Sequence, residues 1–270
     1  MTGLLVQGKL VPVAGLRVIP PASHGGPAWA TLDPGDYRAR TTPWIRQVIL
    51  HTTKGLWPQS VLPGAGPGGR TRWVAEFWRG DPAHSAAQLV VDTDGTVTCL
   101  CDLVRAASYH AQGSNPWSVG IEMYQEASGG IYDATLFATS LLVQALCDVL
   151  SIPPQIPRGP YRGAPLVRME TLRSAERRQL GGPDVVGVLG HRDNTGTRGR
   201  GDPGDEIWTR LAARGFEPVD YAAGEDLVLG RQRQAALIAR GERLVADGLV
   251  GPASLAAARR QGFARWRDVR

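Results

Sequence analysis

The feature that most constrains this chain is a short apolar run ending near a histidine, because the pattern occurs twice. Trp44 to Leu50 and Val185 to Leu189 both have the length and apolar content of buried strands. His51 follows the first run directly, and Gly190 and His191 follow the second. If the two runs share a sheet, the ends of its strands bring both imidazoles to one rim.

A glycine-rich loop follows the second histidine and carries Arg198, Arg200 and Asp202. Two imidazoles and a carboxylate are a ligand set of catalytic zinc sites, which leave a fourth position to water. Taken singly, a histidine at a strand end is more often structural, and an aspartate before proline is more often a turn residue. Together, His51, His191 and Asp202 predict one zinc site, although their spacing alone leaves both interpretations open.

Further patterns predict the elements around these histidines. Gln88–Val91 and Thr96–Leu100 flank an Asp-Gly pair, which is typical of a β-hairpin. Ser118–Met123 has the apolar content of a strand but contains Glu122, an acid that must be paired, hydrated or functional. Ala134–Leu150 has the pattern of an amphipathic helix. Strands with helices between them indicate an α/β layer fold.

A metal-assisted hydrolase also needs a base that holds the water and a cation that stabilises the developing oxyanion. Glu122 suits the first role and Arg200 suits the second. Arg70 to Arg79 has helical spacing and an aromatic stripe that contains Trp73, Phe77 and Trp78. Such a stripe is more often part of a core than a binding surface.

The positive net charge of the chain favours polyanionic partners but does not identify one of them. The formal net charge is +5 and the pI is about 9.4, which favours polyanionic partners such as nucleic acid or an anionic cell wall. Aromatic residues are not interleaved with the basic ones and no groove-reading motif is present, so we expect no specific nucleic-acid partner. The three cysteines form neither a disulfide framework nor a zinc-finger spacing.

The ends of the chain differ from its centre. Met1–Arg40 is rich in glycine and proline, and we expect an extended arm with one edge strand. Asp220–Glu225 has the composition of a linker, and Leu227–Arg270 predicts short helices with nine arginines against three acids. We therefore divide the chain into an arm (1–40), a catalytic domain (41–219), a linker (220–226) and a helical domain (227–270).

The first residues predict where the protein is made. Met1 to Val11 has no basic residue before its apolar stretch, so we expect no signal peptide and synthesis in the cytoplasm. No apolar run approaches the length of a membrane span, so we expect no membrane insertion. The sequence gives no indication of the oligomeric state.

Five ordered blocks resemble those of a known enzyme family. They are V-I-L-H-T-T at His51, S-A-A-Q-L-V-V-D-T-D-G-T-V in the hairpin, Y-H-A at His110, S-V-G-I-E-M at Glu122, and L-G-H-R-D with G-R-G-D-P-G from His191 to Asp202. In this order they resemble the zinc-dependent N-acetylmuramoyl-L-alanine amidases of type 2, which share their fold with peptidoglycan recognition proteins. The resemblance covers about Trp44 to Phe216.

The resemblance implies a mixed central β-sheet flanked by helices, with zinc held by His51, His191 and Asp202. It implies hydrolysis of the amide between N-acetylmuramic acid and L-alanine in peptidoglycan, with Glu122 as the catalytic glutamate that activates the zinc-bound water. Arg200 stands where the family usually has lysine. The loop is one residue longer than usual, so Arg198 is the alternative cation.

Other positions match the substrate groove of this family. His110 matches a histidine that lines the groove, and Asn115 and Trp117 lie near it in the sequence. Thr52, beside the first histidine, is a further candidate for substrate binding.

The C-terminal segment V-A-D-G-L-V-G-P-A-S-L-A-A-A is similar to small three-helix peptidoglycan-binding domains, and a plain helical tail is the alternative. We therefore expect a phage-type endolysin or a bacterial autolysin that acts on the cell wall after release. The alternative function is a recognition protein that binds peptidoglycan without cleaving it. Non-catalytic relatives lose a zinc ligand, whereas this chain keeps all three positions.

Overall fold

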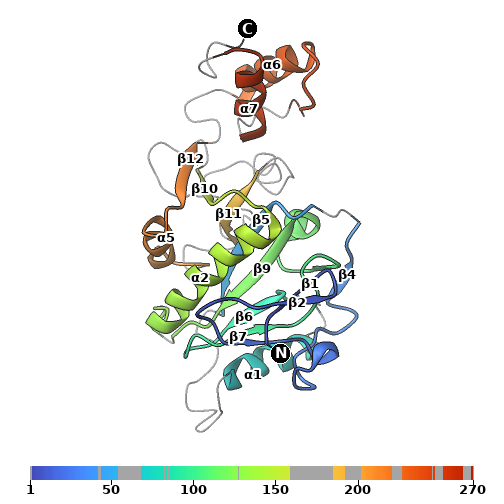
Figure 1. Ribbon diagram of the computed structural model, residues 1–270, viewed down its shortest axis with the longest axis vertical. Coiled ribbons are helices and arrows are strands. Elements are labelled where there is room, and N and C mark those ends of the chain that lie inside the picture. Colours follow the sequence, from blue (N-terminus) through green and yellow to red (C-terminus); the bar gives the residue numbers. More distant parts are fainter. Residues whose placement is uncertain are drawn as a thin grey trace.

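The computed structural model describes residues 2–41, 44–53, 68–81, 83, 85–126, 128–158, 185–191, 202–220, 227–244, 246, 252–263 and 269. Among these residues, a six-stranded mixed sheet forms the centre of the molecule (Figure 1). Four neighbouring strands are parallel, the next returns antiparallel, and the last runs parallel to it. This arrangement confirms the predicted α/β class. The strand order is β11 (Gly187–Gly190), β5 (Gln47–Thr52), β9 (Ser118–Met123), β6 (Leu89–Val91), β7 (Val97–Cys99) and β3 (Val18–Ile19).

The two faces of the sheet carry different helices. Val119 and Ile121 of β9 belong to the main apolar cluster with residues of α2 (Asp133–Leu150), whereas Val90 of β6 packs with α1 (Gly69–Gly80). Successive side chains of a strand point to opposite faces. Glu122 alternates with the residues that face α2, and it therefore lies on the same face as α1.

Helix α2 is 18 residues long with a mean hydropathy of 1.4, enough by length and composition to cross a membrane. This corrects the expectation that no apolar run approaches a membrane span. Half of the helix is buried within the structure, which is the pattern of a core helix. The helix α5 (Glu206–Ala212) lies next to α2, and Glu206 stands in its first turn, where the helix dipole favours an acid.

The first predicted strand begins and ends later than expected. Trp44 is 65 % exposed and precedes β5. The strand continues through His51 and Thr52, because these residues pair in register with Glu122 and Met123 of β9. His51 therefore stands within the sheet and not in the loop after it, which fixes its backbone.

The N-terminal segment packs on the sheet, which corrects the predicted extended arm. β1 (Leu4–Val6) and β2 (Lys9–Val11) form an antiparallel hairpin, and Leu4 and Leu5 are buried in the main core. β3 is the predicted edge strand. A short helix, η1 (Ala22–His24), and β4 (Tyr37–Ala39) follow, and β4 pairs with β8 (Ala106–Ser108). Each of these four strands is too short to show a periodic pattern in the sequence. Only its pairing with another strand in the structure identifies it.

Arg40 ties this segment to the loop that carries His110 and the helix η3 (Gln112–Trp117). Burial lowers the pKa of Arg40 to about 10, so its guanidinium stays charged at neutral pH. One cation thus holds both ends of the loop. The guanidinium donates hydrogen bonds of 2.6–3.4 Å to the carbonyls of Leu103, Val104, Ala106, Asn115, Pro116 and Ser118.

Two further strands lie outside the main sheet. β10 (Gln155–Arg158) and β12 (Glu217–Asp220) form a parallel pair, and β12 follows β11 in the chain. Both strands contain a proline, which argues against a strand when the sequence is read alone.

Helices α6 (Leu227–Ile238) and α7 (Pro252–Arg260) lie at the end of the molecule opposite α1 (Figure 1). They share a small apolar cluster of Leu237, Ala257, Ala258 and Val269 that is separate from the main core. The described residues contain two of the three helices expected for this segment.

Candidate active site

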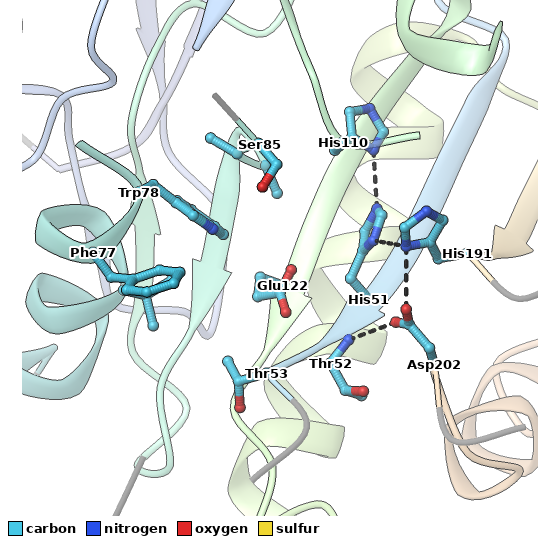
Figure 2. Close-up of a pocket in the computed structure, with 13 residues that line it drawn as sticks. His51, Thr52, Thr53, Phe77, Trp78, Ser85, His110, Glu122, His191 and Asp202 are labelled. Atoms are coloured by element: carbon cyan, nitrogen blue, oxygen red, sulfur yellow. Dashed lines mark hydrogen bonds and ion pairs between the residues drawn. The ribbon is translucent and has the colours of Figure 1, made fainter. Parts of the chain in front are cut away.

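Three side chains able to hold a metal ion converge where β5 and β11 end (Figure 2). We call them the metal-binding group; they belong to His51, His191 and Asp202. One ligand atom of each lies within 4.8 Å of the other two, and all three residues are buried. His51 Nδ1 is 2.8 Å from His191 Nδ1, which is 3.1 Å from Asp202 Oδ2. The structure thus brings together the three residues that the sequence suggested as ligands.

The parallel pairing of β11 with β5 explains why the histidines meet. Gly190 pairs with Leu50, so the residues that follow them, His191 and His51, lie at the same level of the sheet. Asp202 returns from the glycine-rich loop, and the Thr52 backbone N–H donates a 3.0 Å hydrogen bond to its Oδ1. That bond orients the carboxylate and leaves Oδ2 directed at His191.

This donor set fits a zinc ion. Zinc takes neutral imidazole nitrogens and carboxylate oxygens, and a catalytic site uses three such ligands. The exposed fractions of His51, His191 and Asp202 are 4 %, 5 % and 2 %, so little water competes for their lone pairs. Two imidazole nitrogens and a carboxylate oxygen that face one another in a buried site need a shared cation or shared protons.

A cavity of about 160 Å³ opens beside the three donors. Val74, Phe77 and Trp78 of α1 line its opposite wall, and residues 85–87 close one side. Figure 2 shows the two aromatic side chains across the cavity from the histidines. The predicted core role of the stripe holds for Val74 and Trp78, which are buried, but Phe77 is 48 % exposed and Trp73 is also exposed.

Glu122 lies between the aromatic wall and the metal-binding group (Figure 2). It is the register partner of His51, so both side chains rise from the same face of the sheet. It is also the one residue of β9 that is not fully buried. A carboxylate in this position reaches the cavity.

His110 lines the cavity and also contacts a candidate ligand. Its Nδ1 is 2.9 Å from His51 Nε2, and its Nε2 is 3.0 Å from the hydroxyl of Ser118. Burial holds the pKa of His110 well below its usual value, and the neighbouring His191 and Arg40 lower it further. The ring is therefore neutral at pH 7.

Asn115, Trp117, Arg198 and Arg200 were also candidates from the sequence. Asn115 Oδ1 accepts hydrogen bonds from the backbone N–H groups of His110 (3.1 Å) and Ala111 (2.6 Å), so this side chain shapes the loop. Neither Asn115 nor Trp117 is among the described residues that line the cavity. Arg198 and Arg200 lie outside the described residues.

Sequence reasoning missed Ser118 and the aromatic wall of the cavity. Ser118 is an ordinary residue at the start of a strand, and only the folded loop shows that it meets His110. Phe77 carried a weak signal, because it belongs to the aromatic stripe that was assigned to the core.

Comparison with known proteins gives a family. The family model described as Amidase_2, N-acetylmuramoyl-L-alanine amidase, matches residues 40–205, which is more than half of the chain. The match spans β5, β9, β11 and all three candidate metal ligands. No curated protein matches the chain.

Solved structures that match this chain include the following three. An AmpD derivative is 17 % identical, with a TM-score of 0.44, and the match covers 78 % of this chain and 98 % of that one. The endolysin of the Thermus scotoductus bacteriophage Ph2119 is 22 % identical, with a TM-score of 0.42 and coverages of 74 % and 99 %. The peptidoglycan recognition protein PGRP-Hd from Alvinella pompejana is 14 % identical, with a TM-score of 0.39 and coverages of 50 % and 80 %. On the extent of the family match, the chain belongs to the Amidase_2 family of N-acetylmuramoyl-L-alanine amidases.

Proposed function

We propose that this chain is a zinc-dependent hydrolase that cleaves the amide between N-acetylmuramic acid and L-alanine in peptidoglycan. Membership of the amidase family supports the class of bond. One observation carries the proposal further: His51, His191 and Asp202 converge on one point beside Glu122 in an open cavity. A protein that only recognises peptidoglycan has no need for this combination of donors and base.

The zinc ion, when bound by these three residues, supplies a Lewis acid that activates water and polarises the scissile carbonyl. Glu122 holds the attacking water and takes its proton as the new C–O bond forms. The same carboxyl group then delivers that proton to the leaving nitrogen as the C–N bond breaks. The products are the lactyl carboxylic acid of the sugar and the free amine of L-alanine.

Two other groups support this reaction. The Thr52 backbone N–H keeps Asp202 oriented towards the metal-binding group. Arg200, with Arg198 as the alternative, supplies the cation that stabilises the oxyanion. Both arginines are assigned from the sequence, because they lie outside the described residues.

The test combines metal analysis with mass spectrometry of digested cell wall. We expect the purified chain to hold zinc and to release stem peptides that begin with a free L-alanine. His191→Ala is expected to lose both the zinc and the lysis. His24→Ala is the control, because His24 lies in η1 and its ring makes a hydrogen bond with the neighbouring Ser23, away from the three candidate ligands. Full lysis by a metal-free preparation, or wall binding without any cleavage, contradicts the proposal.

A further inference from the structure

The hydroxyl of Ser118 fixes the position of the proton on His110. A serine hydroxyl has one proton to donate, and Ser118 donates it to the carbonyl of Ser114 at 2.7 Å. Its oxygen therefore accepts in the 3.0 Å contact with His110 Nε2. This contact requires the imidazole of His110 to carry its proton on Nε2.

The same reasoning passes from His110 to His51. A neutral imidazole protonated on Nε2 has a lone pair on Nδ1 and acts there only as an acceptor. His110 Nδ1 lies 2.9 Å from His51 Nε2, so His51 Nε2 is the donor in this contact. His51 then has no proton on Nδ1, which is the atom that faces His191 and the metal-binding group.

The residues around His110 hold its ring in place beside His51. The ring lies against Gly120, where an added Cβ would stand 2.6 Å from Nδ1. The Gly120 N–H donates to Gln88 Oε1 at 2.7 Å, and Asn115 Oδ1 holds the His110 backbone. Gly120, Gln88 and Asn115 are all buried, so the His110 ring is packed against buried groups on these sides.

We infer that Ser118 and His110 are positioning residues that set the tautomer of His51, so that His51 Nδ1 presents a lone pair to the zinc site. The inference rests on the proposed function and extends it. Histidines that bind metals usually donate their other N–H to an acceptor, and loss of that acceptor lowers metal affinity about 10- to 100-fold. Here the acceptor is a second imidazole, whose own tautomer is set by a serine.

The test compares two serines of the same loop. Ser118→Ala removes the acceptor for His110 Nε2–H. Ser114→Ala is the matched control: both serines are fully buried, but the Ser114 hydroxyl has no hydrogen-bond partner among the described residues. We expect the Kd for zinc, measured by competition with a chelator, to rise about 10- to 100-fold in Ser118→Ala and to stay unchanged in Ser114→Ala.

Two variants of His110 separate positioning from substrate binding. His110→Ala removes the acceptor for His51 Nε2–H and is expected to weaken zinc binding to a similar degree. His110→Asn keeps an oxygen near the place of Nδ1 and is expected to restore most of the affinity. A rise in KM with unchanged zinc affinity in His110→Ala assigns His110 to substrate binding and overturns the inference. Thermal unfolding of each variant checks that the fold is kept.

The tautomer can also be read directly. Nitrogen-15 NMR of the histidine rings is expected to place a proton on Nε2 of both His51 and His110, with and without zinc. A proton on Nδ1 of His51 in the metal-free protein contradicts the inference. If the wild-type chain binds no zinc or cleaves no peptidoglycan, the proposed function fails, and the NMR result still decides whether Ser118 and His110 set the tautomer.

Discussion

At the scale of single residues, Glu122 offers the sharpest test of the chemistry. Glu122→Gln keeps the shape of the side chain and removes its ability to accept a proton from water. We expect the variant to retain its zinc, because Glu122 is not in the metal-binding group, and to lose about 10²- to 10⁴-fold in hydrolysis rate. Zinc content and initial rates of wall lysis measure the two effects.

The control for this variant is Glu76→Gln, which changes an acid on the surface of α1 that pairs with Arg72. Its rate is expected to equal that of the wild type. Wild-type turnover in Glu122→Gln, with zinc bound, would show that another group accepts the proton.

The sequence correctly predicted that the two histidines are neighbours, because each lies at the end of a predicted strand. His51 and His191 stand at equivalent points of two parallel strands, and Asp202 comes from the glycine-rich loop that follows the second histidine in the sequence. The contact between His110 and Ser118 was not predictable, because it depends on how the loop from residue 109 to 117 folds back on β9. The assignment of Thr52 to substrate binding missed its backbone N–H, which holds Asp202.

At the scale of elements, α1 supplies the wall that faces the metal-binding group, and Phe77 is its most exposed cavity-lining aromatic residue. We expect Phe77 to pack against the apolar parts of the substrate. Phe77→Ala is expected to weaken substrate binding by about 1 kcal/mol, seen as a roughly fivefold rise in KM with little change in zinc content.

Phe137→Ala is the matched control, because Phe137 on α2 is 50 % exposed but lies on another helix, outside the cavity lining. Soluble muropeptides of defined length serve as substrates for both variants. Equal KM values in the two variants would mean that the α1 wall does not contact the substrate.

Elements with a strong local signal were predictable. The Asp-Gly hairpin became β6 and β7, the strand with the buried acid became β9, and the amphipathic run became α2. β4 has three residues, and β10 and β12 have four residues each and contain proline, so their strand character comes from a partner far away in the sequence. No local pattern could show these pairings.

At the scale of the whole molecule, Arg40 explains why the N-terminal segment cannot be a detached arm. Its guanidinium donates hydrogen bonds to backbone carbonyls of the loop that carries His110, so this segment supports the site although it precedes the five sequence blocks. Composition suggested an arm because the segment is rich in glycine and proline. The apolar residues that anchor it, such as Leu4, Leu5 and Val18, lie in short separate runs.

The last prediction concerns the C-terminal helices. α6 and α7 have their own apolar cluster, and the segment 227–270 has nine arginines against three acids. We propose that this segment binds the anionic cell wall and raises the local concentration of the active site on an insoluble substrate. Removal of residues 227–270 is expected to weaken wall pull-down by about tenfold to a hundredfold. Turnover on small soluble muropeptides should stay unchanged, because the cavity and its donors lie in the other part of the chain. Equal wall binding by the shortened chain would refute this role, and a fall in soluble turnover would instead assign the helices to the support of the catalytic fold.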